Sequence, residues 1–115
     1  MSSQKPSQRI TNEVTSWPGV EAGPGDRGEF AFTYRGREIG HLHGERAAHF
    51  GFPKELGATL REEGRVLPHP VAPHSVKMGA RRIEDDADVT NVIELMRLNY
   101  DRLVAKLGGP EPVER

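Results

Sequence analysis

The alternation of apolar and polar residues along the chain changes period several times, and each period predicts one kind of element. Residues 29–44, EFAFTYRGREIGHLHG, alternate with a period of two on both sides of an Arg-Gly pair, which predicts a β-hairpin. Residues 47–52 and 75–83 have shorter strand patterns, and the proline-rich segment 65–74 is at most an edge strand. Residues 19–28 predict a strand stub that runs into a glycine-rich loop. These patterns predict an antiparallel sheet of about four to five strands.

Three other stretches predict helices. Ile10, Val14 and Trp17 are spaced by four and three residues, which predicts a short helix before the Pro-Gly pair that follows. Residues 53–64 begin with a proline and end with a glycine, the usual order at the two ends of a helix. Residues 84–107 predict the longest helix, and acidic residues crowd its first turn, where they suit capping. Its apolar stripe consists of Val89, Val92, Ile93, Met96, Tyr100, Leu103 and Leu107.

The order of these elements predicts one α+β domain. A chain of 115 residues is the usual size for a single core. We expect a two-layer sandwich in which the helices pack on one face of the antiparallel sheet. Met96 and Tyr100, on the last helix, are expected to be buried against the sheet. The domain is expected to span residues 7–107, between disordered tails at 1–6 and 108–115.

The register of the predicted hairpin decides on which face of the sheet the histidines lie. If residues 35–36 form a two-residue turn, His41 faces Phe30 and lies on the aromatic face. If the strands are joined by a three-residue loop with a left-handed glycine and a β-bulge, both His41 and His43 lie away from Phe30 and Phe32. Arginine is a poor occupant of a type I′ turn, which needs positive φ at both central positions, so we favour the bulged register.

Three of the five histidines, His41, His43 and His49, lie close together in the sequence. On a strand, His41 and His43 project from one face about 6–7 Å apart, and two imidazoles at that separation can share a zinc ion at about 2.0–2.1 Å. A functional zinc site needs a third ligand, and the spacing fixes none. The candidates are His49, His69, His74 and Glu45. We therefore expect a polar strand face without a cofactor; if a metal binds, we expect zinc at His41 and His43.

Composition, charge and local motifs argue against several classes of function. A net charge of −1 provides no electrostatic attraction for nucleic acid or an anionic membrane. The absence of cysteine excludes disulfides, thiolate nucleophiles and cysteine-ligated zinc. No apolar run approaches the roughly 18 residues that span a bilayer, and the N-terminus lacks the apolar stretch of a signal peptide, so we expect a cytoplasmic protein without a membrane partner. The G-x-G-x-x-G match at residues 23–28 precedes a predicted strand instead of a helix, which argues against dinucleotide binding.

Three segments together resemble a known family of small proteins. GREIGHLHG, LPHPVAPHS and RRIEDDADVTNVIELMRLNYDR are similar to the bacterial and fungal luciferase-domain family, over roughly residues 10–104. The family name implies common descent without a demonstrated light reaction. The excess of arginine over lysine among the basic residues leads us to expect a bacterial protein from a GC-rich genome. Where the family pattern has an acidic residue after the histidine block, this chain has His49. The positions that fit the pattern are Glu38, His41, His43, His69, Arg97, Tyr100 and Arg102.

These observations lead to three functional hypotheses. The first is a small binding or accessory domain with a histidine-lined pocket for a small-molecule ligand. The second is a metal-dependent or oxidative enzyme that uses His41 and His43. The third, a nucleic-acid-binding module, lacks the basic stripe that such a surface needs. For the first hypothesis, the expected ligand-binding residues are Glu38, His41, His43, His69, Arg97 and Tyr100.

Overall fold

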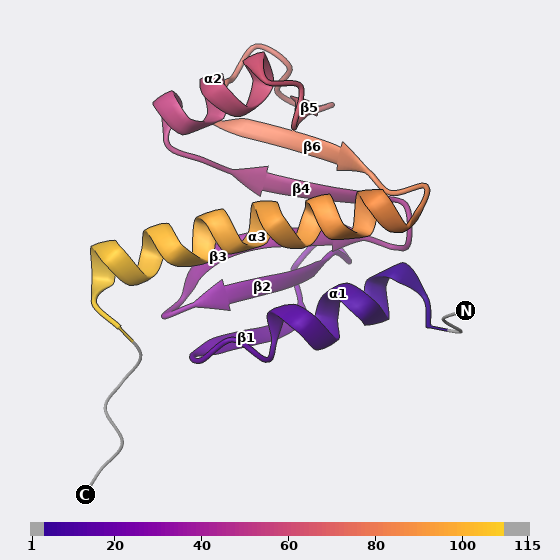
Figure 1. Cartoon of the computed structure of the whole chain (residues 1–115), viewed down its shortest axis with the longest axis vertical. Helices are drawn as coiled ribbons and strands as arrows, with labels where there is room; N and C mark the ends of the chain where they lie inside the picture. The colour runs from indigo at the N-terminus through magenta and orange to yellow at the C-terminus, as the bar shows by residue number, and fades with distance from the viewer. Residues whose placement is uncertain (1–3, 110–115) are drawn as a thin grey trace, which may run out of the picture.

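The computed structural model of the protein describes residues 4–109 (Figure 1). Within this range the chain forms three helices and six strands, and the extreme ends of the predicted tails, residues 1–3 and 110–115, lie outside it. In chain order the elements are α1 (Pro6–Val14), β1 (Val20–Pro24), β2 (Phe30–Tyr34), β3 (Arg37–His43), β4 (Ala47–Gly51), α2 (Lys54–Glu62), β5 (Leu67–Pro68), β6 (Met78–Arg82) and α3 (Asp86–Leu107).

All six strands belong to one sheet, in the order β1-β2-β3-β4-β6-β5 with every neighbouring pair antiparallel. The predicted α+β class is confirmed, but the number of strands is six and not four or five. The difference lies at the two edges of the sheet. The predicted stub, β1, pairs with β2 along its whole length, and the proline-rich β5 adds two residues beside β6.

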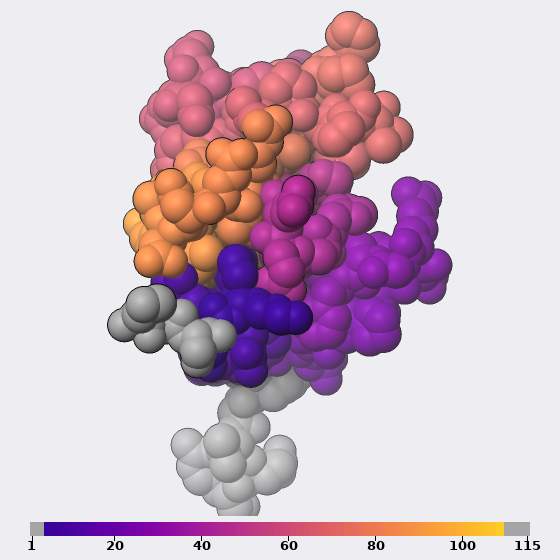
Figure 2. Space-filling view, turned by 90° about the vertical axis from the view of Figure 1, so that its right-hand side faces the viewer, coloured from indigo at the N-terminus to yellow at the C-terminus, as the bar shows by residue number. Residues whose placement is uncertain are grey.

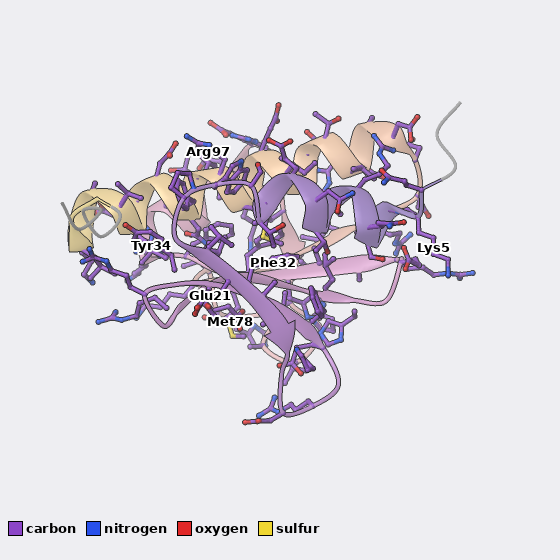
Figure 3. The ribbon with its side chains drawn as sticks, turned by 90° about the horizontal axis from the view of Figure 1, so that it is seen from below. Lys5, Glu21, Phe32, Tyr34, Met78 and Arg97 are labelled. Carbon is purple, nitrogen blue, oxygen red and sulfur yellow. The ribbon has the colours of Figure 1, made fainter. Side chains whose placement is uncertain are left out.

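The helix α3 packs across one face of the sheet, and α1 packs beside it (Figures 1 and 3). A Cβ atom at Gly40 on β3 would lie 2.8 Å from the Met96 sulfur and 2.9 Å from the Phe50 ring, so a larger residue there would force these side chains to move. Met96 and Tyr100 are buried, as predicted. Figure 3 shows Arg97 on the helix side of the sheet and Met78 on the other side. None of the described helices is long and apolar enough to cross a membrane.

The β2–β3 hairpin has the predicted facing of residues but a different turn. Arg35 and Gly36 both have positive φ, 52° and 77°, and form the two-residue turn that the sequence argued against. Phe32 nevertheless pairs with Gly40, because an extra residue, Ile39, is inserted in β3. The bulge therefore lies inside the strand instead of at the turn, and His41 lies on the face away from Phe32, as favoured.

A buried amide completes the hydrogen bonding around the bulge. The ladder between β3 and β4 stops at His41 and His49, so the next opposed carbonyls, those of Ile39 and Gly51, have no partner on the other strand. The Nδ2 group of Asn99 on α3 donates to both, at 3.0 and 2.8 Å. Asn99 is fully buried, so this amide replaces the missing rung of the ladder with a contact from the helix.

The inner ends of both predicted tails belong to the folded domain. Pro6 begins α1, one residue earlier than expected. At the other end, Tyr34 donates its hydroxyl to the carbonyl of Gly108, at 3.0 Å, and the Arg35 guanidinium donates to the carbonyls of Leu107 and Gly109, at 2.8 and 2.7 Å. These bonds fasten the end of α3 to the β2–β3 turn.

Replacing Met96 with alanine should lower the free energy of unfolding by about 2–5 kcal/mol, because Met96 is fully buried and the shorter side chain leaves a cavity. Urea denaturation measures this change. Glu94→Ala, on the exposed side of the same helix, should change stability by less than about 0.5 kcal/mol. An equally small effect of Met96→Ala would contradict the assigned helix face.

Asn99→Leu should destabilise the fold by about 1–3 kcal/mol for each carbonyl that loses its donor, since leucine fills the space but donates nothing. Asn91→Leu makes the same chemical change on the same helix, where Asn91 forms no side-chain hydrogen bond within the described chain, and should have a much smaller effect. Urea denaturation compares the two, and amide hydrogen exchange at His41 should accelerate only in Asn99→Leu. Equal destabilisation by both variants would show that the two bonds contribute nothing specific.

Candidate functional site

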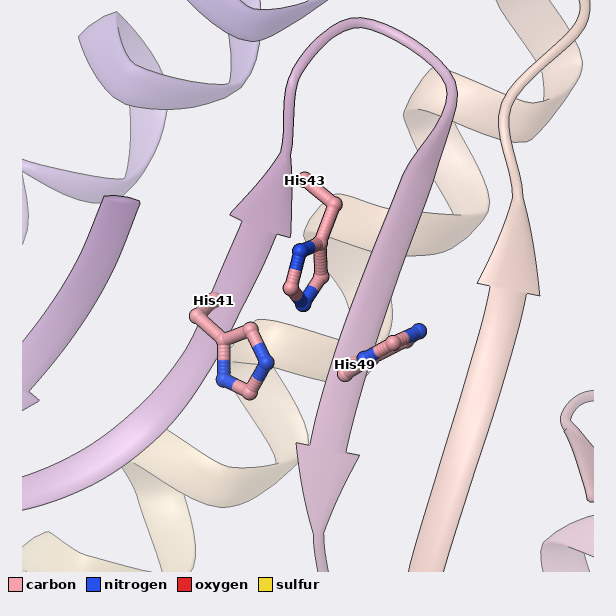
Figure 4. A group of neighbouring side chains, drawn as sticks. All are labelled: His41, His43 and His49. Atoms are coloured by element: carbon pink, nitrogen blue, oxygen red, sulfur yellow. The ribbon is translucent and has the colours of Figure 1, made fainter. Parts of the chain in front are cut away.

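Strand pairing brings three histidines together on the sheet face away from α3. His41 and His43 are two residues apart on β3, and His41 lies directly opposite His49 on β4. The ring centroids are 4.9 Å apart for His41 and His43, 5.3 Å for His41 and His49, and 4.4 Å for His43 and His49. Figure 4 shows the rings gathered on one side of the two strands. We refer to these three residues as the histidine cluster.

The cluster offers three nitrogen ligands in a small space. One ring nitrogen from each histidine lies within 4.8 Å of the other two. Tetrahedral zinc with bonds of about 2.0–2.1 Å separates its ligand nitrogens by about 3.3–3.4 Å. The longest gap therefore has to close by about 1.5 Å at most, which rotation about the side-chain bonds can supply. Three histidines would leave a fourth position on the metal for another ligand.

Alanines surround the histidine cluster on the neighbouring strands. Ala31 pairs with His41, Ala47 pairs with His43, and Ala80 pairs with His49. Side chains on one face of a sheet contact their cross-strand partners, so a larger residue at these positions would press on the rings. The alanines leave the imidazoles room to turn and leave space above the sheet beside them.

Glu38 fixes the ring orientation of His41. Its carboxylate lies 2.8 Å from Nδ1 of His41. A carboxylate only accepts, so Nδ1 carries the proton and donates, which leaves the lone pair of Nε2 free for a metal. Histidine ligands of metal sites almost always donate their second ring nitrogen to a carboxylate or a carbonyl. The Glu38–His41 pair has this arrangement.

His69 lies against the cluster, but its hydrogen bonding suits a donor and not a metal ligand. Its ring is 4.3 Å from that of His49, and it is buried. The backbone N–H of Val71 donates to Nδ1 of His69 at 3.1 Å, so in the neutral ring the proton is on Nε2. With one nitrogen already accepting and the other protonated, His69 offers a hydrogen-bond donor instead of a metal ligand.

Arg61 on α2 holds the segment that carries His69. Its guanidinium donates to the carbonyls of Pro73 and Ser75 at 3.1 and 2.8 Å, with a longer bond of 3.3 Å to Met78. Three prolines remove backbone donors from this stretch, so it cannot be held by a full ladder of its own. Arg61 therefore supplies the tertiary bonds that place the segment over the sheet.

Burial keeps part of the site uncharged. Desolvation, together with repulsion from the other three histidines, lowers the pKa of His49 from its ordinary value of 6.5 to about 4. Desolvation also lowers the pKa of His69, and His41 and His43 add to that effect. At neutral pH, His49 and His69 are therefore neutral, the form in which a histidine ring can bind a metal or donate a neutral hydrogen bond.

The sheet divides the set of site residues that the resemblance implied. Tyr100 packs on the ring of Trp17 at 5.3 Å, and the Arg97 guanidinium lies 5.1 Å from the Tyr100 ring, both on the helix side. Arg102 donates to the buried amide oxygen of Asn99 at 3.2 Å. These residues hold α3 in place and share no pocket with the histidines. Of the implied residues, His41 and His43 belong to the cluster, and Glu38 and His69 lie beside it.

Of the four candidates for a third ligand, the strand pairing selects His49. Glu45 instead accepts hydrogen bonds from the backbone N–H and hydroxyl of Ser7, at 2.8 and 2.6 Å, at the start of α1. His74 is exposed on the segment between β5 and β6. The expectation of an unmetallated polar face depended on the lack of a fixed third ligand, and the pairing of His49 with His41 removes that reason.

Comparison with known proteins gives one match. A family model described as the luciferase domain matches residues 36–99, more than half of the chain. The matched segment runs from the β2–β3 turn to the buried Asn99, so it contains the whole histidine cluster. No curated protein and no solved structure matches the chain.

The low pKa of His49 predicts that acid destabilises the metal-free domain. As pH falls below 6.5, the unfolded chain binds a proton at residue 49 that the folded chain excludes down to about pH 4, so stability decreases through that interval. His49→Gln should flatten this decrease, which urea midpoints at pH 7, 6 and 5 measure. His74→Gln, at an exposed site, should follow the wild type. Parallel pH profiles for all three proteins would refute the effect.

Proposed function

Since the chain belongs to the luciferase-domain family, whose name fixes no reaction, we propose its function from the site: it binds one divalent transition-metal ion through His41, His43 and His49. The observation that carries the proposal is the convergence of three imidazole nitrogens within 4.8 Å of one another. The function that follows is metal-dependent binding of a small molecule at the position that the histidines leave open.

The chemistry of the ligands favours a metal of borderline softness. Imidazole suits zinc, copper, iron and nickel, whereas magnesium and calcium prefer oxygen ligands. The three ligands are neutral when they bind, so they leave the double positive charge of the ion uncompensated. The fourth ligand is then expected to be an anion or a water molecule that loses a proton readily. His69 supplies a neutral N–H beside His49 that can donate to such a ligand.

A metal-dependent enzyme is the second candidate. The observation that favours it is the combination of an open metal position with the buried His69, because a bound oxygen would gain both a Lewis acid and a hydrogen-bond donor. Binding and catalysis use the same residues, so both depend on the metal site.

Calorimetric titration with zinc should give saturable one-to-one binding, and thermal unfolding should shift upward as zinc increases. His41→Ala, His43→Ala and His49→Ala should each abolish or strongly weaken binding. Glu38→Gln should weaken it by roughly 10–100-fold, because glutamine holds the His41 ring less firmly. His74→Ala should bind like the wild type. Absence of saturable binding, or equal loss in His74→Ala, would disprove the site.

A further inference from the structure

A hollow of about 770 Å³ adjoins the histidine cluster and reaches the start of β4 and the end of β6. This volume lies in the range of small-molecule sites. His49 lines the hollow, so a ligand in it can reach a metal held by the cluster. Figure 2 faces the end of the molecule where the turn after β3, the start of α3 and the proline-rich segment meet.

The floor and roof of the hollow are apolar. Ala47 and Ala80 lie on adjacent strands beneath it, and Leu67, Pro68 and Pro70 line it from the proline-rich segment. Leu67 is 51% exposed, although large apolar side chains are usually buried in a core. An apolar body in the hollow would cover part of this surface.

The charged residues that line the hollow are Arg46, Arg81, Arg82 and Glu84. Arg46 forms no ion pair or side-chain hydrogen bond with the described chain, and Arg82 has only an exposed contact of 3.8 Å to Glu84. Arg81 also lines the hollow, but its guanidinium is already bonded to the Arg65 carbonyl and to Asp88. Glu84 is the one acidic residue in this lining, and its side chain is 68% exposed. The arginines therefore outnumber it, and the net charge of the lining is positive.

We infer that the hollow binds a small organic carboxylate with an apolar body, its acid group held by Arg46 and Arg82 and its opposite end directed to the metal. A planar guanidinium matches a carboxylate with two parallel hydrogen bonds. The alanines and prolines contact the apolar body, and an oxygen at the opposite end would fill the open metal position. The contact between the ligand oxygen and the metal rests on the proposed function. The contact between the ligand carboxylate and the arginines does not.

The carboxylate end is tested without metal. Titration of the metal-free protein with hexanoate, followed by amide chemical shifts of Ala47, Ala80 and Arg46, should give saturable changes with millimolar affinity. Hexan-1-ol, which has the same chain length but no charge, should bind at least about tenfold more weakly, the loss expected for a charged hydrogen bond. Arg46→Gln should weaken hexanoate binding to a similar extent. Arg27→Gln, which removes the same charge on an exposed loop, should leave it unchanged.

The metal end is tested with adipate, which carries a carboxylate at each end. Zinc-loaded protein should bind adipate at least about tenfold more tightly than hexanoate. His41→Ala, which removes a metal ligand that does not line the hollow, should lose this advantage. Equal binding of hexanoate and hexan-1-ol, or equal weakening by Arg46→Gln and Arg27→Gln, would overturn the inference. If hexanoate binds as expected but zinc does not, the proposed metal site is wrong and the carboxylate site at the arginines is supported. If zinc binds but hexanoate does not, the metal site is supported and the carboxylate site is wrong.

Discussion

The bulge at Ile39 is the constraint on which the site depends. In a regular strand, residues 39, 41 and 43 share one face, so burying Ile39 would direct both histidines into the core. The extra residue in β3 breaks this rule once. Ile39 is completely buried, while His41 lies on the open face opposite His49. The bulge thus allows Ile39 to face the core and His41, only two residues later, to face the open side of the sheet.

The helix side of the molecule stabilises this irregularity. The bulge and the separation of β3 from β4 leave carbonyls that no strand can satisfy, and Asn99 satisfies them from α3. Gly40 admits the helix closely enough for that contact. The positive φ of Arg35 is also compensated on this side, because its guanidinium binds the carbonyls at the end of α3. The geometry of the histidines is therefore coupled to the packing of a helix that never touches them.

Local patterns in the sequence predicted the elements, and tertiary pairing decided the site. The periods of the hairpin and of residues 84–107 are properties of single segments, so the facing of Phe32 and the burial of Met96 could be inferred from them. The position of the bulge depends on Asn99, which lies 60 residues away in the chain. The role of His49 depends on the register between two strands, and no single-segment pattern contains that information.

The residues around the histidines argue for a binding role over a structural one. An exposed sheet face is best stabilised by threonine, valine and aromatic residues, and alanine is disfavoured there. This face instead has Ala31, Ala47 and Ala80 as the cross-strand partners of the three histidines. Small neighbours weaken the sheet but give the rings space and leave a hollow beside them. Burial of His49, which makes it hard to protonate, also disfavours a purely structural charge pair there. A face built in this way sacrifices sheet stability for access to the imidazole nitrogens, which is what a ligand-binding surface requires.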